Sequence, residues 1–154
     1  LMDPALIDAL AARMADEPHL EMATAATPIT AAEDLRAPSV VKVVCDLDDC
    51  ALYFSRSLIP FARDVPPETL LDRGLYLRHL GIYAYRRDFL LRLVQHPPHP
   101  LEETEKLEQL RALALGIRPA VLRCNLPAPG VDTPEDLQQV RAIWTQQQGT
   151  PSCS

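Results

Sequence analysis

The sequence predicts a single α/β layered domain, in which helices pack against a sheet. Segments with apolar residues at helical spacing alternate with β-prone runs, and two of these runs flank a short acidic turn. A chain of 154 residues with 47% hydrophobic content is long enough for one core, whereas two domains would each be small. We therefore expect one domain over residues 1–147 and a disordered tail over residues 148–154.

The first predicted elements are two helices separated by a strand. Apolar residues at helical spacing predict a helix over residues 4–16, and Asp3-Pro4 supplies its N-cap and a proline in the first turn. Residues 22–29 read as a short strand. The segment Thr30-Ala31-Ala32-Glu33 has the pattern of a capping box, and it begins a brief helix that ends before Pro38.

A hairpin, a loop and a further strand are expected in the middle of the chain. Residues 40–46 and 51–56 are β-prone and are predicted to pair around the acidic turn between them. Residues 57–74 combine prolines with charged residues, which is typical of an exposed loop. Residues 75–86 form the next predicted strand.

The last third alternates between helix and strand. We expect a helix over residues 87–95, a break at Pro97-Pro98-His99-Pro100, and one longer helix over residues 101–115. A strand follows over residues 117–124, and a final helix runs over residues 133–147. In such a layered domain, ligands bind near the carboxyl ends of the strands.

Charge and hydropathy restrict the classes of ligand. The formal net charge is −6 and the sequence pI is near 5.1, so no basic field exists for a nucleic-acid backbone or an anionic membrane. No apolar run approaches the roughly 18 residues that span a bilayer. A small anionic substrate remains compatible with this composition, because a few arginines converging in one cleft can bind it.

The cysteines and loop histidines carry no predicted chemistry. The chain has four cysteines, none in a Cys-x-x-Cys pair or at zinc-ligand spacing. We expect reduced thiols and a cytoplasmic location, although Cys45 and Cys50 could approach each other across the hairpin. His96 and His99 lie among prolines without ligand partners nearby in sequence, which argues against a metal site there.

Two pairs of polar residues are candidates for binding a hydroxylated ligand. Alternation along the strand over residues 75–86 places His79 and Tyr83 on one face, with Gly81 allowing close approach to the backbone. Glu108 and Gln109 fall between two core-facing leucines and could form hydrogen bonds with vicinal hydroxyls of a ligand. The alternatives are a half-exposed strand with locally satisfied side chains and a solvated helix flank.

Asp132 and two arginines are the remaining candidates. Asp132 lies between a strand and a helix start, where a carboxylate could hold Mg²⁺ against nucleotide phosphates. Its alternative role is to assist the cap at Thr133. Arg56 and Arg63 bracket the segment that leaves the hairpin, where guanidinium groups could meet a carboxylate or phosphate, although ordinary surface arginines explain them equally well.

Several segments are similar, in sequence and in their order along the chain, to motifs of one enzyme family. They include Met22-Ala23-Thr24, Val41-Lys42-Val43-Val44, Ala51-Leu52-Tyr53-Phe54-Ser55-Arg56, Arg78-His79-Leu80-Gly81-Ile82-Tyr83-Ala84-Tyr85-Arg86, Leu107-Glu108-Gln109-Leu110-Arg111 and Gly130-Val131-Asp132-Thr133-Pro134-Glu135-Asp136-Leu137. Over about residues 1–143 the chain thereby resembles the 3-deoxy-manno-octulosonate cytidylyltransferases, or CMP-Kdo synthetases. The resemblance implies a nucleotide-diphospho-sugar transferase-like layered fold, incomplete here, with an inserted β-hairpin in a dimerisation region.

The resemblance also implies an activity. Members transfer CMP from CTP to the eight-carbon acid sugar Kdo for lipopolysaccharide biosynthesis, release pyrophosphate, use Mg²⁺ and form homodimers. Site roles carry over to this chain as follows: His79 and Tyr83 line the Kdo pocket, Glu108 and Gln109 bind its hydroxyls, Asp132 is a catalytic Mg²⁺ ligand, and Arg56 faces the sugar's carboxylate. No covalent enzyme intermediate is expected.

The chain also departs from the family pattern. The Arg/Lys/Gly-rich CTP loop and a second Mg²⁺ carboxylate of the family precede the point corresponding to Leu1, so we expect this chain alone to be inactive. Asp49-Cys50 stands where members usually carry glycine, which predicts strain in the hairpin turn. Two other functions stay open: a cytidylyltransferase for another 2-keto acid sugar such as sialic acid, and a non-catalytic dimerising remnant.

Overall fold

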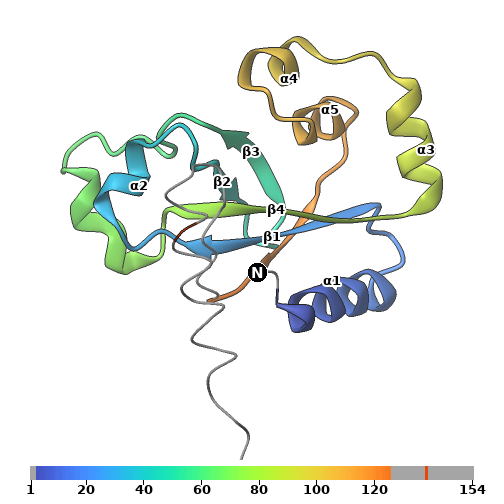
Figure 1. Ribbon diagram of the computed structural model, residues 1–154, viewed down its shortest axis with the longest axis horizontal. Coiled ribbons are helices and arrows are strands. Elements are labelled where there is room, and N and C mark those ends of the chain that lie inside the picture. The colour runs from blue at the N-terminus through green and yellow to red at the C-terminus, as the bar shows by residue number, and fades with distance from the viewer. Residues whose placement is uncertain (1–2, 126–137, 139–154) are drawn as a thin grey trace, which may run out of the picture.

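The computed structural model describes residues 3–125 and residue 138. Residues 3–125 form a mixed α/β fold around one five-stranded sheet (Figure 1). The strand order is β3-β2-β4-β1-β5. The strands are β1 (Met22–Pro28), β2 (Lys42–Cys45), β3 (Ala51–Ser55), β4 (Leu77–Tyr85) and β5 (Ala120–Arg123). β1 lies between β4, to which it is antiparallel, and β5, to which it is parallel. The predicted α/β class and the predicted hairpin of β2 and β3 are confirmed.

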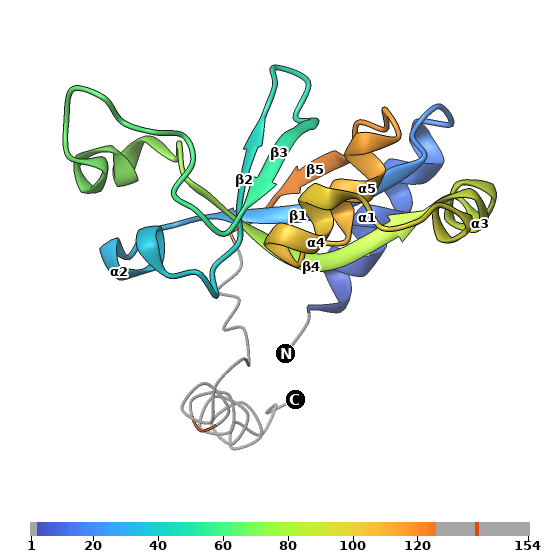
Figure 2. The ribbon, with the colours of Figure 1, turned by 90° about the horizontal axis from the view of Figure 1, so that it is seen from above.

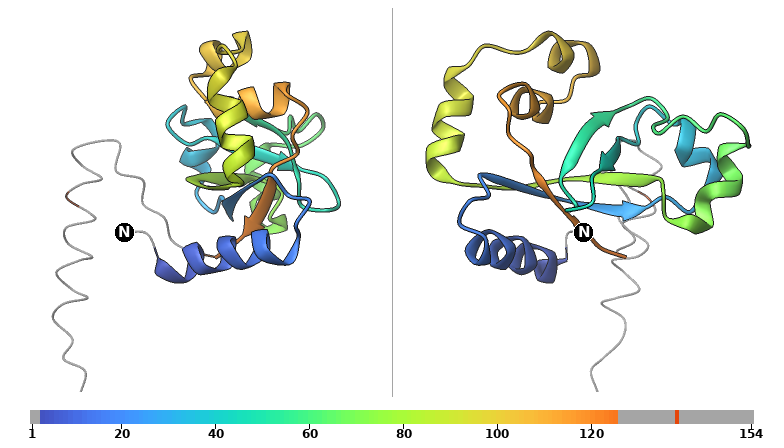
Figure 3. Two further views of the ribbon diagram at one scale, coloured as in Figure 1. Left: turned by 90° about the vertical axis from the view of Figure 1, so that its right-hand side faces the viewer. Right: turned by 180° about the vertical axis from the view of Figure 1, so that it is seen from behind.

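Helices cover both faces of the sheet. They are α1 (Pro4–Asp16), α2 (Ala32–Arg36), α3 (Arg87–Gln95), α4 (Pro100–Glu105), α5 (Gln109–Ala114) and the 3₁₀ helix η1 (Pro67–Arg73). α1 lies on one side of β1 and β4, and α3, α4 and α5 lie on the other side (Figures 1 and 3). α2 and η1 sit together at the end of the molecule away from α3 (Figure 2). None of these helices is long and apolar enough to cross a membrane.

Alternation along β4 divides the core into two layers. Leu80 packs with α1 residues such as Leu10, whereas Leu77 packs with Leu110 of α5. The β1–β4 register shifts between Thr24 and Ala25, where two extra β4 residues are accommodated. Because an even number of residues is inserted, the side chains on either side of the shift keep the faces that the sequence predicts.

The tip of the β2–β3 hairpin closes onto the outer edge of β5. Ala51 N donates to Pro119 O at 2.8 Å, and Val121 N donates to Asp49 O at 2.7 Å. The carboxylate of Asp49 also lies 2.7 Å from Arg123 Nε. The two outer strands therefore meet at one corner, and the sheet is curled. Asp49, which stands where family members usually carry glycine, has φ 54° and is therefore left-handed. Aspartate tolerates this conformation better than most residues.

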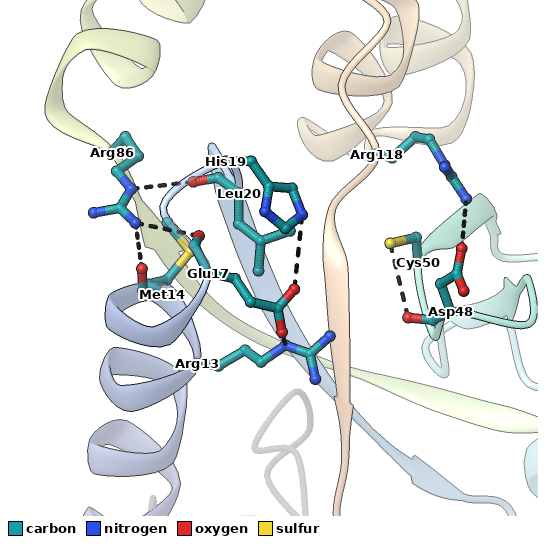
Figure 4. Close-up of polar contacts among 9 residues, drawn as sticks. All are labelled: Arg13, Met14, Glu17, His19, Leu20, Asp48, Cys50, Arg86 and Arg118. Carbon is teal, nitrogen blue, oxygen red and sulfur yellow. Dashed lines mark hydrogen bonds and ion pairs between the residues drawn. The ribbon is translucent and has the colours of Figure 1, made fainter.

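Arg86 at the end of β4 holds the carboxyl end of α1 (Figure 4). Its guanidinium donates to Leu20 O at 3.1 Å and also contacts Met14 O. At the same end of α1, Arg13 Nε lies 2.7 Å from Oε1 of Glu17, the C-cap residue. A planar group with five donors can bind several backbone carbonyls at once, so Arg86 fixes the carboxyl end of α1 against the sheet.

Other predicted elements need correction. The single helix expected over residues 101–115 is wrong, because Lys106 adopts a left-handed conformation, with φ 55°, that separates α4 from α5. The expected capping box at Thr30 is also wrong, since α2 has Ala31 as its N-cap and no side-chain cap. The predicted loop over residues 57–74 contains η1.

The predicted tail and Asp132 lie outside the described residues. Of the helix expected over residues 133–147, the structure describes Gln138, which is helical.

Candidate functional site

The centre of the site is His79, on the face of β4 that α5 covers. Its side chain is almost enclosed, with the residue 9% exposed. Nε2 lies 2.9 Å from Thr24 Oγ1, and the Phe54 ring meets the imidazole edge-on with centroids 4.9 Å apart. Burial lowers the pKa of His79 to about 4, so the ring is neutral at pH 7.

A row of rings extends from His79 along β4. The ring centroids of His79 and Tyr83 are 5.4 Å apart, and those of Tyr83 and Tyr85 are 5.8 Å apart. Burial raises the pKa of Tyr83, with smaller contributions from Tyr85 and from the charge of Glu108, so its hydroxyl stays protonated. The predicted sharing of one face by His79 and Tyr83 is confirmed. Such a surface offers apolar ring faces together with hydroxyl and imidazole groups, which suits a sugar.

Glu108 and Gln109 stand at the start of α5, above this row. Glu108 is exposed, and its negative charge adds to the burial that raises the pKa of both Tyr83 and Tyr85. Gln109 is buried. The structure thus brings the start of α5, with Glu108, to the face of β4 that carries His79. The helix predicted over residues 101–115 is divided just before Glu108.

Arg56 lies at the end of β3, with its guanidinium on backbone carbonyls. Nε donates to Glu105 O at 2.7 Å and Nη1 to Pro38 O at 2.8 Å. The carboxylate of Glu105 accepts in return from Arg56 N at 2.9 Å. Arg56 O itself accepts from the buried ammonium of Lys42 at 2.7 Å. These contacts join β3 to the carboxyl end of α4, just before the turn that carries Glu108.

The other candidates are placed elsewhere. Arg63 is exposed and pairs with its neighbour Asp64 at 2.9 Å. His99 caps α4, accepting from Leu101 N at 3.2 Å through Nδ1. Within the part of the chain that the structure describes, no group of three or more His, Cys, Asp or Glu side chains could hold a metal ion.

The described cysteines are free thiols with no shared role. They are Cys45, Cys50 and Cys124, and no disulfide joins them. Burial raises the pKa of Cys45 to about 11, so this thiol is poorly reactive at neutral pH. Cys153 lies outside the described residues.

Three residues at the site were not among the sequence-based candidates: Thr24, Phe54 and Tyr85. Tyr85 shares the face of Tyr83, so the strand period could have found it. Thr24 and Phe54 come from other strands, and their contacts with His79 depend on strand pairing. No local sequence signal predicts those contacts.

Comparison with known proteins identifies the family. Residues 1–118 match the sequence profile described as cytidylyltransferase. The chain belongs to the cytidylyltransferase family. It is 46% identical over 145 residues to the 3-deoxy-manno-octulosonate cytidylyltransferase of Geobacter sulfurreducens, and 48% identical over 149 residues to that of Methylibium petroleiphilum.

A solved structure gives the same result for the fold. The structure of CMP:2-keto-3-deoxy-manno-octonic acid synthetase complexed with CTP matches this cytidylyltransferase chain with a TM-score of 0.83 and 41% identity. The match covers 95% of this chain and 58% of that one. The two curated relatives are covered over 58% and 56% of their lengths, so the chain spans little more than half of each. The predicted family and layered fold are confirmed.

Proposed function

We propose that this chain is the sugar-binding portion of a 3-deoxy-manno-octulosonate cytidylyltransferase. The enzyme would transfer CMP from CTP to Kdo, release pyrophosphate and supply CMP-Kdo for lipopolysaccharide biosynthesis. The observation that carries the proposal is 46–48% identity, over more than nine tenths of this chain, to two relatives of that name. The structural neighbour that contains CTP supports the nucleotide substrate.

The Kdo pocket is proposed on the face of β4 beneath α5. Neutral His79 and protonated Tyr83 would hydrogen-bond sugar hydroxyls, and the ring faces would cover its carbon atoms. Glu108 would accept from vicinal hydroxyls, and Gln109 would both accept and donate. The support for this arrangement is the contact of the His79 and Tyr83 rings, with centroids 5.4 Å apart, and the packing of Leu110 of α5 with Leu77 of β4.

Arg56 and Asp132 are the remaining residues to which the family resemblance assigns a role. The family resemblance assigns Arg56 to the sugar's carboxylate, but its carbonyl contacts favour a role in holding the turn before Glu108. Asp132 would be a Mg²⁺ ligand, since this ion takes one or two carboxylates and fills its remaining positions with water and phosphate oxygens. Bound Mg²⁺ would neutralise charge on the nucleotide phosphates. The protein's own residues would orient the anomeric hydroxyl toward the α-phosphorus.

A homodimer is proposed through the β2–β3 hairpin and the loop that follows it, and the location is proposed to be cytoplasmic. The loop and hairpin expose large apolar side chains, with Phe61 81% and Leu52 59% exposed. Exposed apolar groups of this size commonly mark interaction surfaces. Light scattering should report a dimer that Phe61→Asp weakens. Leu101→Asp on α4 is the matched control and should leave the mass unchanged, so equal effects would contradict the proposed contact.

The substrate is tested with the protein that carries this chain. Pyrophosphate release from CTP and Mg²⁺ should depend on Kdo and should be far slower with N-acetylneuraminate. A preference for the sialic acid would overturn the substrate assignment. Kdo titration into the chain itself tests the pocket: Glu108→Gln should weaken binding about tenfold, because the hydrogen bonds from the sugar hydroxyls lose their charged acceptor. Glu103→Gln makes the same change at an exposed position of α4 and should have no effect.

A further inference from the structure

Thr24 occupies the place where β1 and β4 fall out of register. It is fully buried, and it pairs with Tyr83 while the next residue, Ala25, pairs with Leu80. Its hydroxyl oxygen lies 2.7 Å from Ile82 O and 3.3 Å from Leu80 O. The same oxygen lies 2.9 Å from His79 Nε2. A single hydroxyl therefore joins the irregular stretch of β4 to the imidazole of the candidate site.

The positions of these atoms decide which way the proton points. A threonine hydroxyl has one proton, and carbonyl oxygens only accept. Two oxygens 2.7 Å apart repel unless a proton lies between them, so the hydroxyl donates to Ile82 O. Thr24 Oγ1 can then only accept from His79, which requires a proton on Nε2. The opposite arrangement would leave the Ile82 contact without a hydrogen.

The rest of the His79 environment keeps the ring neutral. The aromatic rings of Phe54 and Tyr83 pack against it, and no charged group makes a described hydrogen bond or ion pair with it. A neutral imidazole with a proton on Nε2 has a lone pair on Nδ1. Among the described residues, no hydrogen bond involves His79 Nδ1. That nitrogen is available as an acceptor.

We propose that Thr24 is a positioning residue that fixes His79 as its Nε2–H tautomer, so that Nδ1 accepts a hydrogen bond from a hydroxyl of the bound sugar. The identity of the ligand rests on the proposed function, whereas the tautomer rests on this chain alone. A neutral acceptor attracts hydroxyl donors and disfavours carboxylate oxygens. His79 therefore selects a hydroxyl of the sugar, and the sugar's carboxylate lies elsewhere in the pocket.

The tautomer is measured directly by NMR of the ¹⁵N-labelled chain at pH 7. Long-range ¹H–¹⁵N spectra distinguish protonated from unprotonated ring nitrogens, and His79→Gln identifies the His79 signals among the four histidines. We expect a protonated Nε2 and an unprotonated Nδ1. A proton on Nδ1, or on both nitrogens, would overturn the proposal.

Variants at Thr24 test its part in the mechanism. Thr24→Val keeps the shape but removes the hydroxyl, so the two tautomers should mix, whereas Thr24→Ser should restore the wild-type spectrum. An unchanged tautomer in a folded Thr24→Val protein would show that Thr24 does not set it. Should Thr24→Val fail to fold, the wild-type and Thr24→Ser spectra decide.

Kdo titration separates this inference from the proposed function. In the wild type, Kdo should shift the Nδ1 resonance as it gains a hydrogen bond, and Thr24→Val should weaken binding about threefold to tenfold. Kdo binding with Nδ1 unperturbed would refute the acceptor role. Absence of Kdo binding beside an Nε2–H tautomer would count against the proposed function and leave the role of Thr24 in place.

Discussion

Replacing Glu102 by alanine should remove one of the strongest side-chain pairs in the chain. The Glu102 carboxylate, with its side chain 10% exposed, accepts from Arg111 Nη2 at 2.6 Å and from Arg111 Nε at 2.8 Å. It also accepts from His99 N at 3.2 Å, which closes the amino end of α4. The pair links α4 to α5, the two short helices beside the candidate sugar pocket.

The expected loss follows from what the substitution leaves behind. Breaking a buried ion pair costs about 3–5 kcal/mol, because the remaining charge is left without a partner. The Arg111 side chain is 19% exposed and keeps a contact with His96 O at 3.1 Å, so the low end applies and we expect about 3 kcal/mol. For a domain of this size, that corresponds to a fall in Tm of about 6–12 °C.

Urea and thermal unfolding followed by circular dichroism provide the measurement. Glu103→Ala on the same helix is the matched control, since Glu103 is exposed, and it should change stability by less than about 0.5 kcal/mol. Hydrogen bonding to Arg111 lowers the pKa of Glu102, so its contribution is present above the unfolded pKa and is lost as pH falls through the folded pKa. Equal losses in the two variants at pH 7 would refute the reasoning.

Three further outcomes are expected. The folded pKa of His79 is about 4, below its ordinary 6.5, so the unfolded chain binds the extra proton between these values, and stability should fall by up to about 3 kcal/mol as pH drops from 6.5 to 4. The profile of His79→Gln should lack this component, and identical profiles would contradict it. Lys42→Met leaves three backbone carbonyls without the ammonium donor and should lower stability by about 2 kcal/mol in urea; an unchanged midpoint would show that the donor is dispensable. Iodoacetamide should label Cys45 far more slowly in the folded chain than in urea, by peptide mass spectrometry, because burial raises its pKa to about 11; equal rates would rule out that protection.

The sequence predicts much of this fold because its strongest signals are local. The helices over residues 4–16 and 87–95 begin and end where caps, prolines and apolar spacing indicate. The shared face of His79 and Tyr83 follows from strand alternation, and it survives the register shift because the insertion has an even number of residues. These features need no knowledge of distant parts of the chain.

The features that the sequence does not reveal depend on tertiary contacts. Nothing local marks Lys106 as left-handed, since neither glycine nor asparagine stands there, yet this residue divides one predicted helix into two. The Glu102–Arg111 pair then bridges the two helices. Likewise, the hydroxyl of Thr24 reaches His79 only through the pairing of two strands 55 residues apart. Long-range pairings of this kind carry no signature in hydrophobic periodicity.

The closure of the hairpin tip onto β5 has a consequence for how the chain reaches its native state. The ion pairs at this corner join residues 72 and 74 positions apart, Asp46 to Arg118 and Asp49 to Arg123. A contact between residues so far apart in sequence requires a long loop to close, and this closure has an entropic cost. We therefore expect the hairpin to form early by itself and to dock late, so that substitutions at Arg118 or Arg123 accelerate unfolding more than they slow folding.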